Sequence, residues 1–129
     1  MIESYRDLFV FRKACELTAQ IYRMTDGFPV EERYNLTGQM RRAAASIPMN
    51  IAEGYRRSSR RDYVHFLTIA SGSCSELDAQ LIISRDINLI DTSQYDAIHQ
   101  NQRFVSILLT RLSSALKSNP NPGRPKPRA

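Results

Sequence analysis

Residues 46–63 read "SIPMNIAEGYRRSSRRDY". The stretch places Pro48 inside a helical pattern, with Gly54 six positions later. A proline in a helix interior removes one backbone hydrogen bond and costs about 3 kcal/mol unless the chain compensates, usually by bending. We therefore expect a kink at Pro48, with Ser46 and Asn50 satisfying the freed backbone groups. Such a bend either fits the helix around a core or opens a surface for another subunit.

A helix boundary is predicted at Ser58 and Ser59, between two pairs of arginines. The sequence Ser59-Arg60-Arg61-Asp62 has the form of a capping box, in which a serine accepts from a backbone N–H three residues later. One helix should therefore end at Arg57 and the next should begin after Ser59. Since both helix ends meet at this turn, the arginines should crowd one corner of the fold.

Apolar residues recur every three or four positions along the whole chain up to residue 118, which is typical of amphipathic helices. The four rows are Leu8, Ala14, Leu17, Ile21 and Met24; Leu36, Met40, Ala43, Ile47 and Ile51; Tyr63, Phe66, Leu67, Ala70, Cys74, Leu77 and Leu81; and Tyr95, Ile98, Val105, Leu108, Leu112 and Leu116. Short connections between four such helices favour an all-α, antiparallel up-down four-helix bundle with a proline-kinked second helix. We expect one domain over residues 1–118.

Residues 119–129, "NPNPGRPKPRA", hold four prolines and three basic residues. This composition predicts a disordered, basic, proline-rich tail. The chain lacks an N-terminal secretion pattern and any apolar run near the ~18 residues that a membrane span needs, so we expect a cytoplasmic protein. Both Cys15 and Cys74 fall on apolar helical positions, which predicts two buried thiols and no redox motif.

Enzyme signatures such as a phosphate-binding loop, a nucleophile elbow or a zinc-protease motif are absent from the sequence. Asp62-x-x-His65 and Asp96-x-x-His99 share the spacing of metal-binding bundles. In an antiparallel bundle, however, the two histidines should lie roughly 20–25 Å apart along the axis, at ~1.5 Å per residue. We therefore expect no catalytic residue, no metal and no cofactor.

Positive charge is concentrated in the 119–129 segment and in residues 41–61, although the net charge is only +5. Residues 41–61 hold six arginines against one acidic residue, Glu53, which can pair with Arg57 one helical turn away. Because arginine suits phosphate and helix N-termini attract anions, the predicted nucleic-acid site is formed by Arg41, Arg42, Arg56, Arg57, Arg60 and Arg61. Alternatively, the protein is a scaffold or adaptor whose arginines bind an acidic protein partner. A third interpretation is a solvated corner without a specific role.

Two runs carry a resemblance to a known family: "FPVEERYNLTGQMRRAAASIPMNIAEGYRR" and "YVHFLTIASGSCSEL". They resemble the four-helix-bundle family named after the 23S rRNA intervening-sequence protein, over about residues 5–116. Its motif falls on Pro48, Asn50, Glu53 and Gly54, and Phe11 stands where tryptophan is common. The resemblance implies a left-handed up-down bundle that forms a homopentamer, without an assigned molecular function. The related accessory proteins of diversity-generating retroelements form basic pentamers that bind nucleic acid and a reverse transcriptase.

Overall fold

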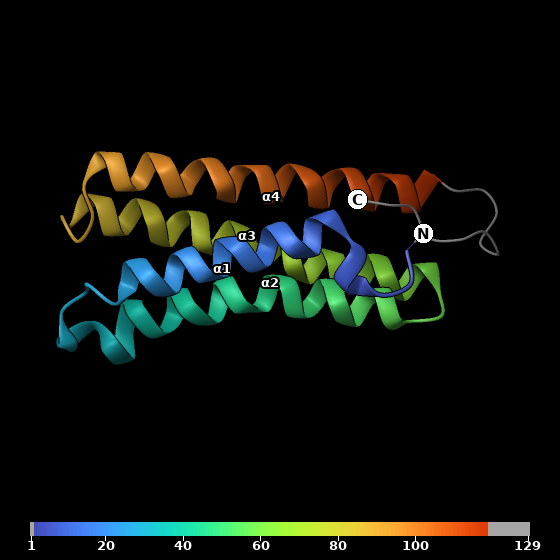
Figure 1. The fold of residues 1–129 in the computed structure, drawn as a ribbon, viewed down its shortest axis with the longest axis horizontal. Helices are drawn as coiled ribbons and strands as arrows, with labels where there is room; N and C mark the ends of the chain where they lie inside the picture. Colours follow the sequence, from blue (N-terminus) through green and yellow to red (C-terminus); the bar gives the residue numbers. More distant parts are fainter. Residues whose placement is uncertain (1, 119–129) are drawn as a thin grey trace.

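The computed structural model of the chain describes residues 2–118 (Figure 1). Within them lie four long helices and no strand: α1 (Phe9–Thr25), α2 (Gly38–Arg56), α3 (Arg60–Asp86) and α4 (Thr92–Ser118). A 3-10 turn (Tyr5–Asp7) precedes α1, and a 3-10 turn (Val30–Glu32) and a π-helical turn (Arg33–Thr37) lead into α2. The predicted all-α fold is confirmed, and the tail predicted at 119–129 lies outside the described residues.

Consecutive helices run in opposite directions, as the contacts between them require. In each pair of helices, the residue numbers of successive contacts rise along one helix and fall along the other, which is the pattern of antiparallel packing. The contacts are Thr18–Ala44 and Tyr22–Arg41 between α1 and α2, Ser46–Ser73 and Met40–Ser84 between α2 and α3, and Cys74–Gln102 and Asp78–His99 between α3 and α4. Helix α1 also packs against α4, so each helix has two neighbours and the bundle is closed.

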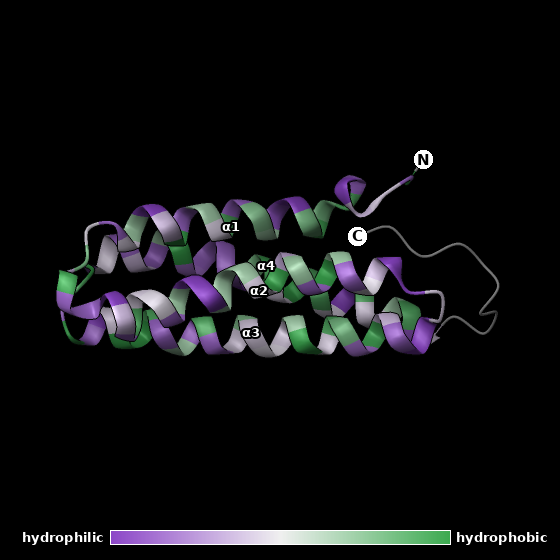
Figure 2. Cartoon of the chain, turned by 90° about the horizontal axis from the view of Figure 1, so that it is seen from below, coloured by the Kyte–Doolittle hydropathy of each residue, from purple (hydrophilic) through white to green (hydrophobic). Residues whose placement is uncertain are grey.

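The core is formed by the inward stripe of each helix, and hydrophobic and hydrophilic residues alternate along the ribbons (Figure 2). Its largest fully buried side chains are Tyr63, Leu8, Leu17, Ile21, Met40, Ile47, Ile51, Leu67, Leu77, Leu81, Leu109 and Leu116. Cys74 is buried as predicted, and burial raises its pKa to about 11. The prediction for Cys15 is wrong, because its thiol is on the exposed side of α1, next to buried Ala14. The buried face of α1 is narrower than the set of apolar residues in its sequence.

Helices α2 and α3 approach each other closely at Gly54. A Cβ atom added there would lie 3.0 Å from Phe66 Cβ and 3.2 Å from the backbone oxygen of Tyr63. Farther along the pair, Ser73 Oγ donates to Ser46 Oγ over 2.8 Å, between small side chains of both helices. The glycine and the serines therefore set the separation of this pair.

Pro48 lies inside α2, which continues unbroken around it. The carbonyl of Ala44 loses its usual donor there, because proline has no N–H. The hydroxyl of Thr18, on α1, lies 2.9 Å from that carbonyl and 2.9 Å from the Ala14 carbonyl of its own helix, so its single proton can be donated to either. Asn50 donates instead to Ser46 O and Ser46 Oγ, so the expectation that Ser46 and Asn50 meet the freed group is wrong. The kink itself stays a prediction.

Replacing Thr18 by valine is expected to lower the free energy of unfolding by about 1–2 kcal/mol, because the Ala44 carbonyl is left without a donor. Chemical denaturation of the variant measures this. In the double variant with Pro48→Ala, position 48 regains its N–H, so the cost of Thr18→Val should shrink to a few tenths of a kcal/mol or less. Equal costs in both backgrounds would show that the threonine does not serve this carbonyl.

Hydrogen-bonded caps fix both ends of the α3–α4 hairpin. Ser59 Oγ accepts from Asp62 N over 3.0 Å, which confirms the predicted start of α3. At the other end, Asn88 adopts a positive φ of 64°, a conformation that asparagine tolerates well. Asp91 and Gln94 then cap α4 reciprocally, since each side chain accepts from the other's backbone N–H. Together these features fix where α3 and α4 begin.

Candidate nucleic-acid interface

The ends of three helices bring five basic residues to one end of the bundle. Arg56 and Arg57 close α2, Arg60 and Arg61 open α3, and Lys117 lies in the last turn of α4. We call these five residues the basic corner. All are exposed except Arg60, which is half-buried. The structure thus brings together four of the six predicted arginines and adds a lysine.

Arg57 is held in place by contacts with both neighbouring helices. Its Nη2 lies 2.6 Å from Glu53 Oε1, which confirms the predicted pair. The guanidinium also lies over the ring of Phe66, 4.8 Å from its centre. Beneath it, Tyr63 is fully buried, and burial raises the pKa of its phenol, so it stays neutral. Arg57 therefore has a structural role in joining α2 to α3.

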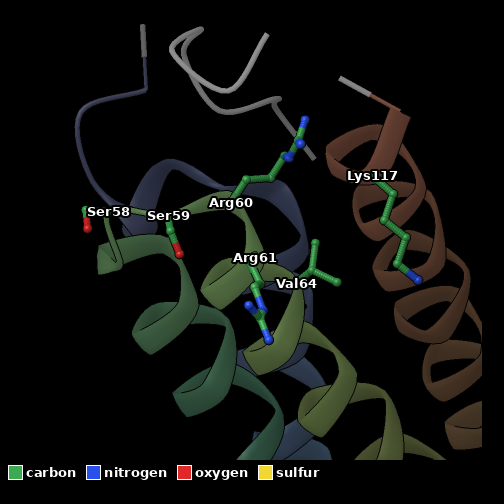
Figure 3. A pocket seen from close by; sticks show the side chains of 6 residues that line it. All are labelled: Ser58, Ser59, Arg60, Arg61, Val64 and Lys117. Carbon is green, nitrogen blue, oxygen red and sulfur yellow. The ribbon is translucent and has the colours of Figure 1, made fainter. Parts of the chain in front are cut away.

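An open hollow of about 540 Å³ lies between the start of α3 and the end of α4 (Figure 3). It is lined by Ser58, Ser59, Arg60, Arg61, Val64 and Lys117. Arg60 and Arg61 leave α3 in different directions, and Lys117 lies across Val64 from them. The Nη1 atom of Arg60 is buried and has no hydrogen-bond partner in the described part of the chain.

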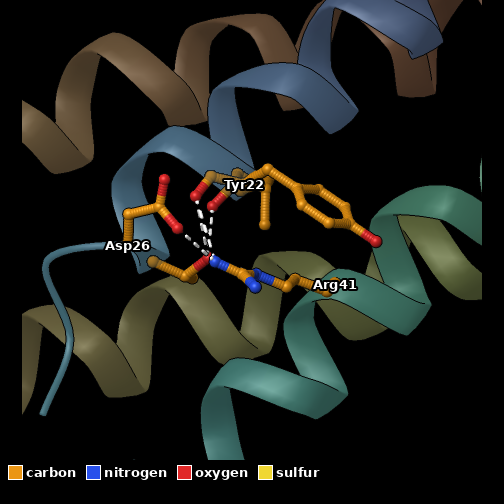
Figure 4. A network of polar contacts seen from close by, with 5 residues as sticks. Tyr22, Asp26 and Arg41 are labelled. Carbon is orange, nitrogen blue, oxygen red and sulfur yellow. Dashed lines mark hydrogen bonds and ion pairs between the residues drawn. The ribbon is translucent and has the colours of Figure 1, made fainter. Parts of the chain in front are cut away.

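Arg41 belongs to a different part of the molecule, where it links α2 to the end of α1 (Figure 4). Its Nη2 lies 2.8 Å from Asp26 Oδ1, and its Nε donates to Thr25 Oγ1 over 2.8 Å. Nη2 also lies 3.3 Å from the Tyr22 carbonyl, and the guanidinium covers the Tyr22 ring at 4.7 Å. These contacts use most of its donors, so we assign Arg41 a structural role.

Arg42, the next residue along α2, is exposed. It shares one face of α2 with Met49 and Arg56, because residues seven apart lie close to the same side of a helix. Met49 is 62% exposed, so no neighbouring helix covers this face. Arg42 and Arg56 are about 21 Å apart along the axis, at ~1.5 Å per residue. Arg42 thus stands apart from the basic corner but on a surface continuous with Arg56.

The histidines do not assemble a metal centre within the described residues, which hold no group of three possible metal ligands. His99 lies 3.4 Å from Asp78 and stacks on Tyr95, whose ring centre is 5.1 Å away. His65 instead packs edge-on against Phe66 near the opposite end of α3. Among residues 2–118, no helix is long and apolar enough to cross a bilayer.

Lys117 is the site residue that the sequence interpretation missed. The predicted site was confined to arginines that are close together in the sequence. The α3–α4 pairing supplies the missing signal: Cys74 lies against Gln102 and Asp78 against His99. Carried to the other end of the hairpin, the same pairing places Lys117 opposite Arg60.

The fold and the site define a small all-helical bundle with a basic end and without a recognisable catalytic arrangement in the described residues. The family model for the 23S rRNA-intervening sequence protein matches residues 6–111. The chain belongs to this family, as its sequence resemblance predicts.

A solved structure gives the same fold. It is the crystal structure, at 1.70 Å resolution, of a protein with unknown function from the S23 ribosomal protein family of Bacteroides thetaiotaomicron VPI-5482. It is 25% identical in sequence, with a TM-score of 0.75, over 84% of this chain and 96% of that chain. No curated protein matches the chain.

Proposed function

We propose that this protein is a non-enzymatic, cytoplasmic oligomer that binds the phosphate backbone of RNA or DNA through its basic corner together with Arg42. The observation that carries the proposal is the convergence of five cations from three helices at one end of the bundle. Arg60 and Arg61 lie at a helix N-terminus, where the helix dipole disfavours cations. Their position is therefore poorly explained by stability and well explained by an anionic ligand.

Backbone contact is favoured over base recognition by the composition of the corner. Tyr63 is buried, so its ring cannot stack on an unpaired base. Phe66 is covered on one side by Arg57. Arginine and lysine can instead bind phosphate oxygens of any sequence. We therefore expect little sequence preference.

Association of subunits is part of the proposal, with a pentameric ring as the arrangement that the family resemblance implies. Apolar side chains on the outside of the bundle support it: Met49 is 62% exposed, Ile83 47% and Ile87 54%. In a ring of identically oriented subunits, every basic corner would face the same side. Repetition would then raise the local density of positive charge. Light scattering tests this, and a clean monomer would contradict it.

Binding to a mixed panel of RNA and DNA strands is expected at low salt, with affinity that falls as salt rises. A surface that makes four phosphate contacts is expected to lose about 100-fold in affinity between about 50 and 200 mM salt, because bound counterions are released on binding. Fluorescence anisotropy across a salt series measures the slope. Strands of different sequence should give similar slopes.

Absence of binding to every strand at low salt would contradict the proposed function. The alternative, an acidic protein partner, makes a different prediction: one stoichiometric partner should be retained by the purified protein after nuclease treatment. Absorbance provides a simple first check. The chain has six tyrosines and no tryptophan, so its own absorbance at 280 nm is weak and co-purified nucleic acid is easily seen.

A further inference from the structure

We propose that the hollow between α3 and α4 is a binding site for a terminal phosphate, the phosphomonoester at the end of a nucleic-acid strand. This inference rests on the proposed function. It assigns the end of a strand to the hollow and the phosphates within the strand to the rest of the corner. Of the three remaining cations, Arg42 and Arg56 lie on an exposed helix face and suit internal phosphates, while Arg57 is paired with Glu53. The hollow is an open concave surface lined from two helices.

The charges around the hollow suit a dianion. Arg60, Arg61 and Lys117 line it, and no acidic residue of the described chain is among its lining residues. A phosphomonoester carries about −1.5 to −2 charges at pH 7, whereas an internal phosphodiester carries one. Three cations around one recess therefore match an end phosphate better than a phosphate within the strand.

The donors of the hollow come from more than one direction. Lys117 contributes an ammonium from α4, while Arg61 contributes a guanidinium from α3. Hydroxyl donors are available from Ser58 and Ser59, although the Ser59 oxygen also accepts from Asp62 N. The first backbone N–H groups of α3 have no partner within the helix, as in any helix, and add to the attraction for anions. Arg60 lines the hollow, but its guanidinium points away from Arg61 and Lys117, so these two residues are the main side-chain donors (Figure 3).

The apolar side of the hollow and its size are consistent with a nucleotide end. Val64 forms an apolar wall between Arg61 and Lys117, against which a sugar can pack. A volume of about 540 Å³ lies within the usual range for small-ligand sites.

The test compares short single strands of one sequence that carry a 5′-phosphate, a 3′-phosphate or only hydroxyl ends, by fluorescence anisotropy at fixed salt. We expect at least one phosphorylated end to bind about tenfold more tightly than the hydroxyl-ended strand, as one or two charge-assisted hydrogen bonds would give. Inorganic phosphate should compete for the hollow and reduce this difference in affinity. The competition shows how much of the difference comes from the phosphate group alone and how much from the strand.

Arg61→Gln and Lys117→Gln should each remove the advantage of the phosphorylated end. Both side chains are exposed, so neither variant should unfold the bundle. The matched control is Arg103→Gln, which removes one exposed charge from the outside of α4 and should leave the advantage intact. Circular dichroism tests whether all variants are equally helical.

Equal affinity for phosphorylated and hydroxyl-ended strands would overturn the inference while leaving the proposed function standing. An advantage that persists in the double variant Arg61→Gln/Lys117→Gln would also overturn it. If no strand binds, titration with inorganic phosphate followed by NMR separates the two ideas. Shifts of the Arg61 and Lys117 signals would then support a phosphate site in the hollow although the nucleic-acid proposal fails, and unchanged signals would remove both.

Discussion

Replacing Gly54 by valine is expected to lower the free energy of unfolding by about 3 kcal/mol, because the site has no room for a side chain. Even the first added carbon would lie 3.0 Å from Phe66 Cβ and 3.2 Å from the Tyr63 backbone oxygen. Neither atom can rotate away, so α2 and α3 must separate. Valine adds two further methyl groups to this contact. Urea denaturation measures the loss.

Gly72→Ala is the matched control, on the exposed side of α3. Nothing lies within 4 Å of the Cβ that it would add. Alanine also loses less backbone entropy than glycine in a helix, so this variant should gain about 0.5–1 kcal/mol. Opposite signs at the two glycines would establish that close packing, and not helix propensity, decides the effect at Gly54. A stable Gly54→Val protein with an unchanged unfolding midpoint would contradict the packing argument.

The second large effect is expected from replacing Arg56, Arg57, Arg60 and Arg61 together by glutamine. Affinity for RNA and DNA should fall at least about 100-fold at low salt, because several charge-assisted contacts to phosphate are lost at once. The salt dependence should also flatten, since each lost phosphate contact removes about 0.9 from the slope. Anisotropy titrations over a salt series measure both quantities.

A charge-matched control separates a specific surface from general attraction. Four other exposed arginines, Arg23, Arg33, Arg103 and Arg111, are replaced by glutamine in the same way. The net charge then falls by the same amount, while the basic corner stays intact. If both quadruple variants lose affinity equally, the corner is not a distinct binding surface. Because Arg57 also packs against Phe66 and Glu53, thermal melting of the first variant must accompany its binding data.

Local sequence signals predicted the fold well, because they depend on neighbouring residues. The cap at Ser59 and the ion pair between Glu53 and Arg57 each involve residues within one helical turn. Helical periodicity also placed most of the core correctly. Besides Cys15, the predicted residues Met24, Leu36, Phe66 and Leu108 are only half-buried, and the fully buried Leu109 was not predicted. A cysteine is small and weakly apolar, so it fits either side of a stripe boundary and gives little information about its own orientation.

The role of each charged residue could not be predicted in the same way, because it depends on contacts between helices. Arg41 and Arg42 are neighbours in sequence, yet the first binds Asp26 and the second is exposed. Lys117 joins the corner only through the α3–α4 pairing. Thr18 reaches the carbonyl freed by Pro48 from a different helix. In each case the deciding partner is at least 15 residues away along the chain.

The contact between Thr18 and Ala44 also bears on the order in which the bundle forms. Pro48 leaves the Ala44 carbonyl of α2 without its usual helical donor, and most helical stability in proteins comes from tertiary packing. Docking of α1 brings the Thr18 hydroxyl within reach of this carbonyl. We therefore expect α2 to depend on α1 for its stability. Hydrogen exchange should then protect the two helices together, as one cooperative unit.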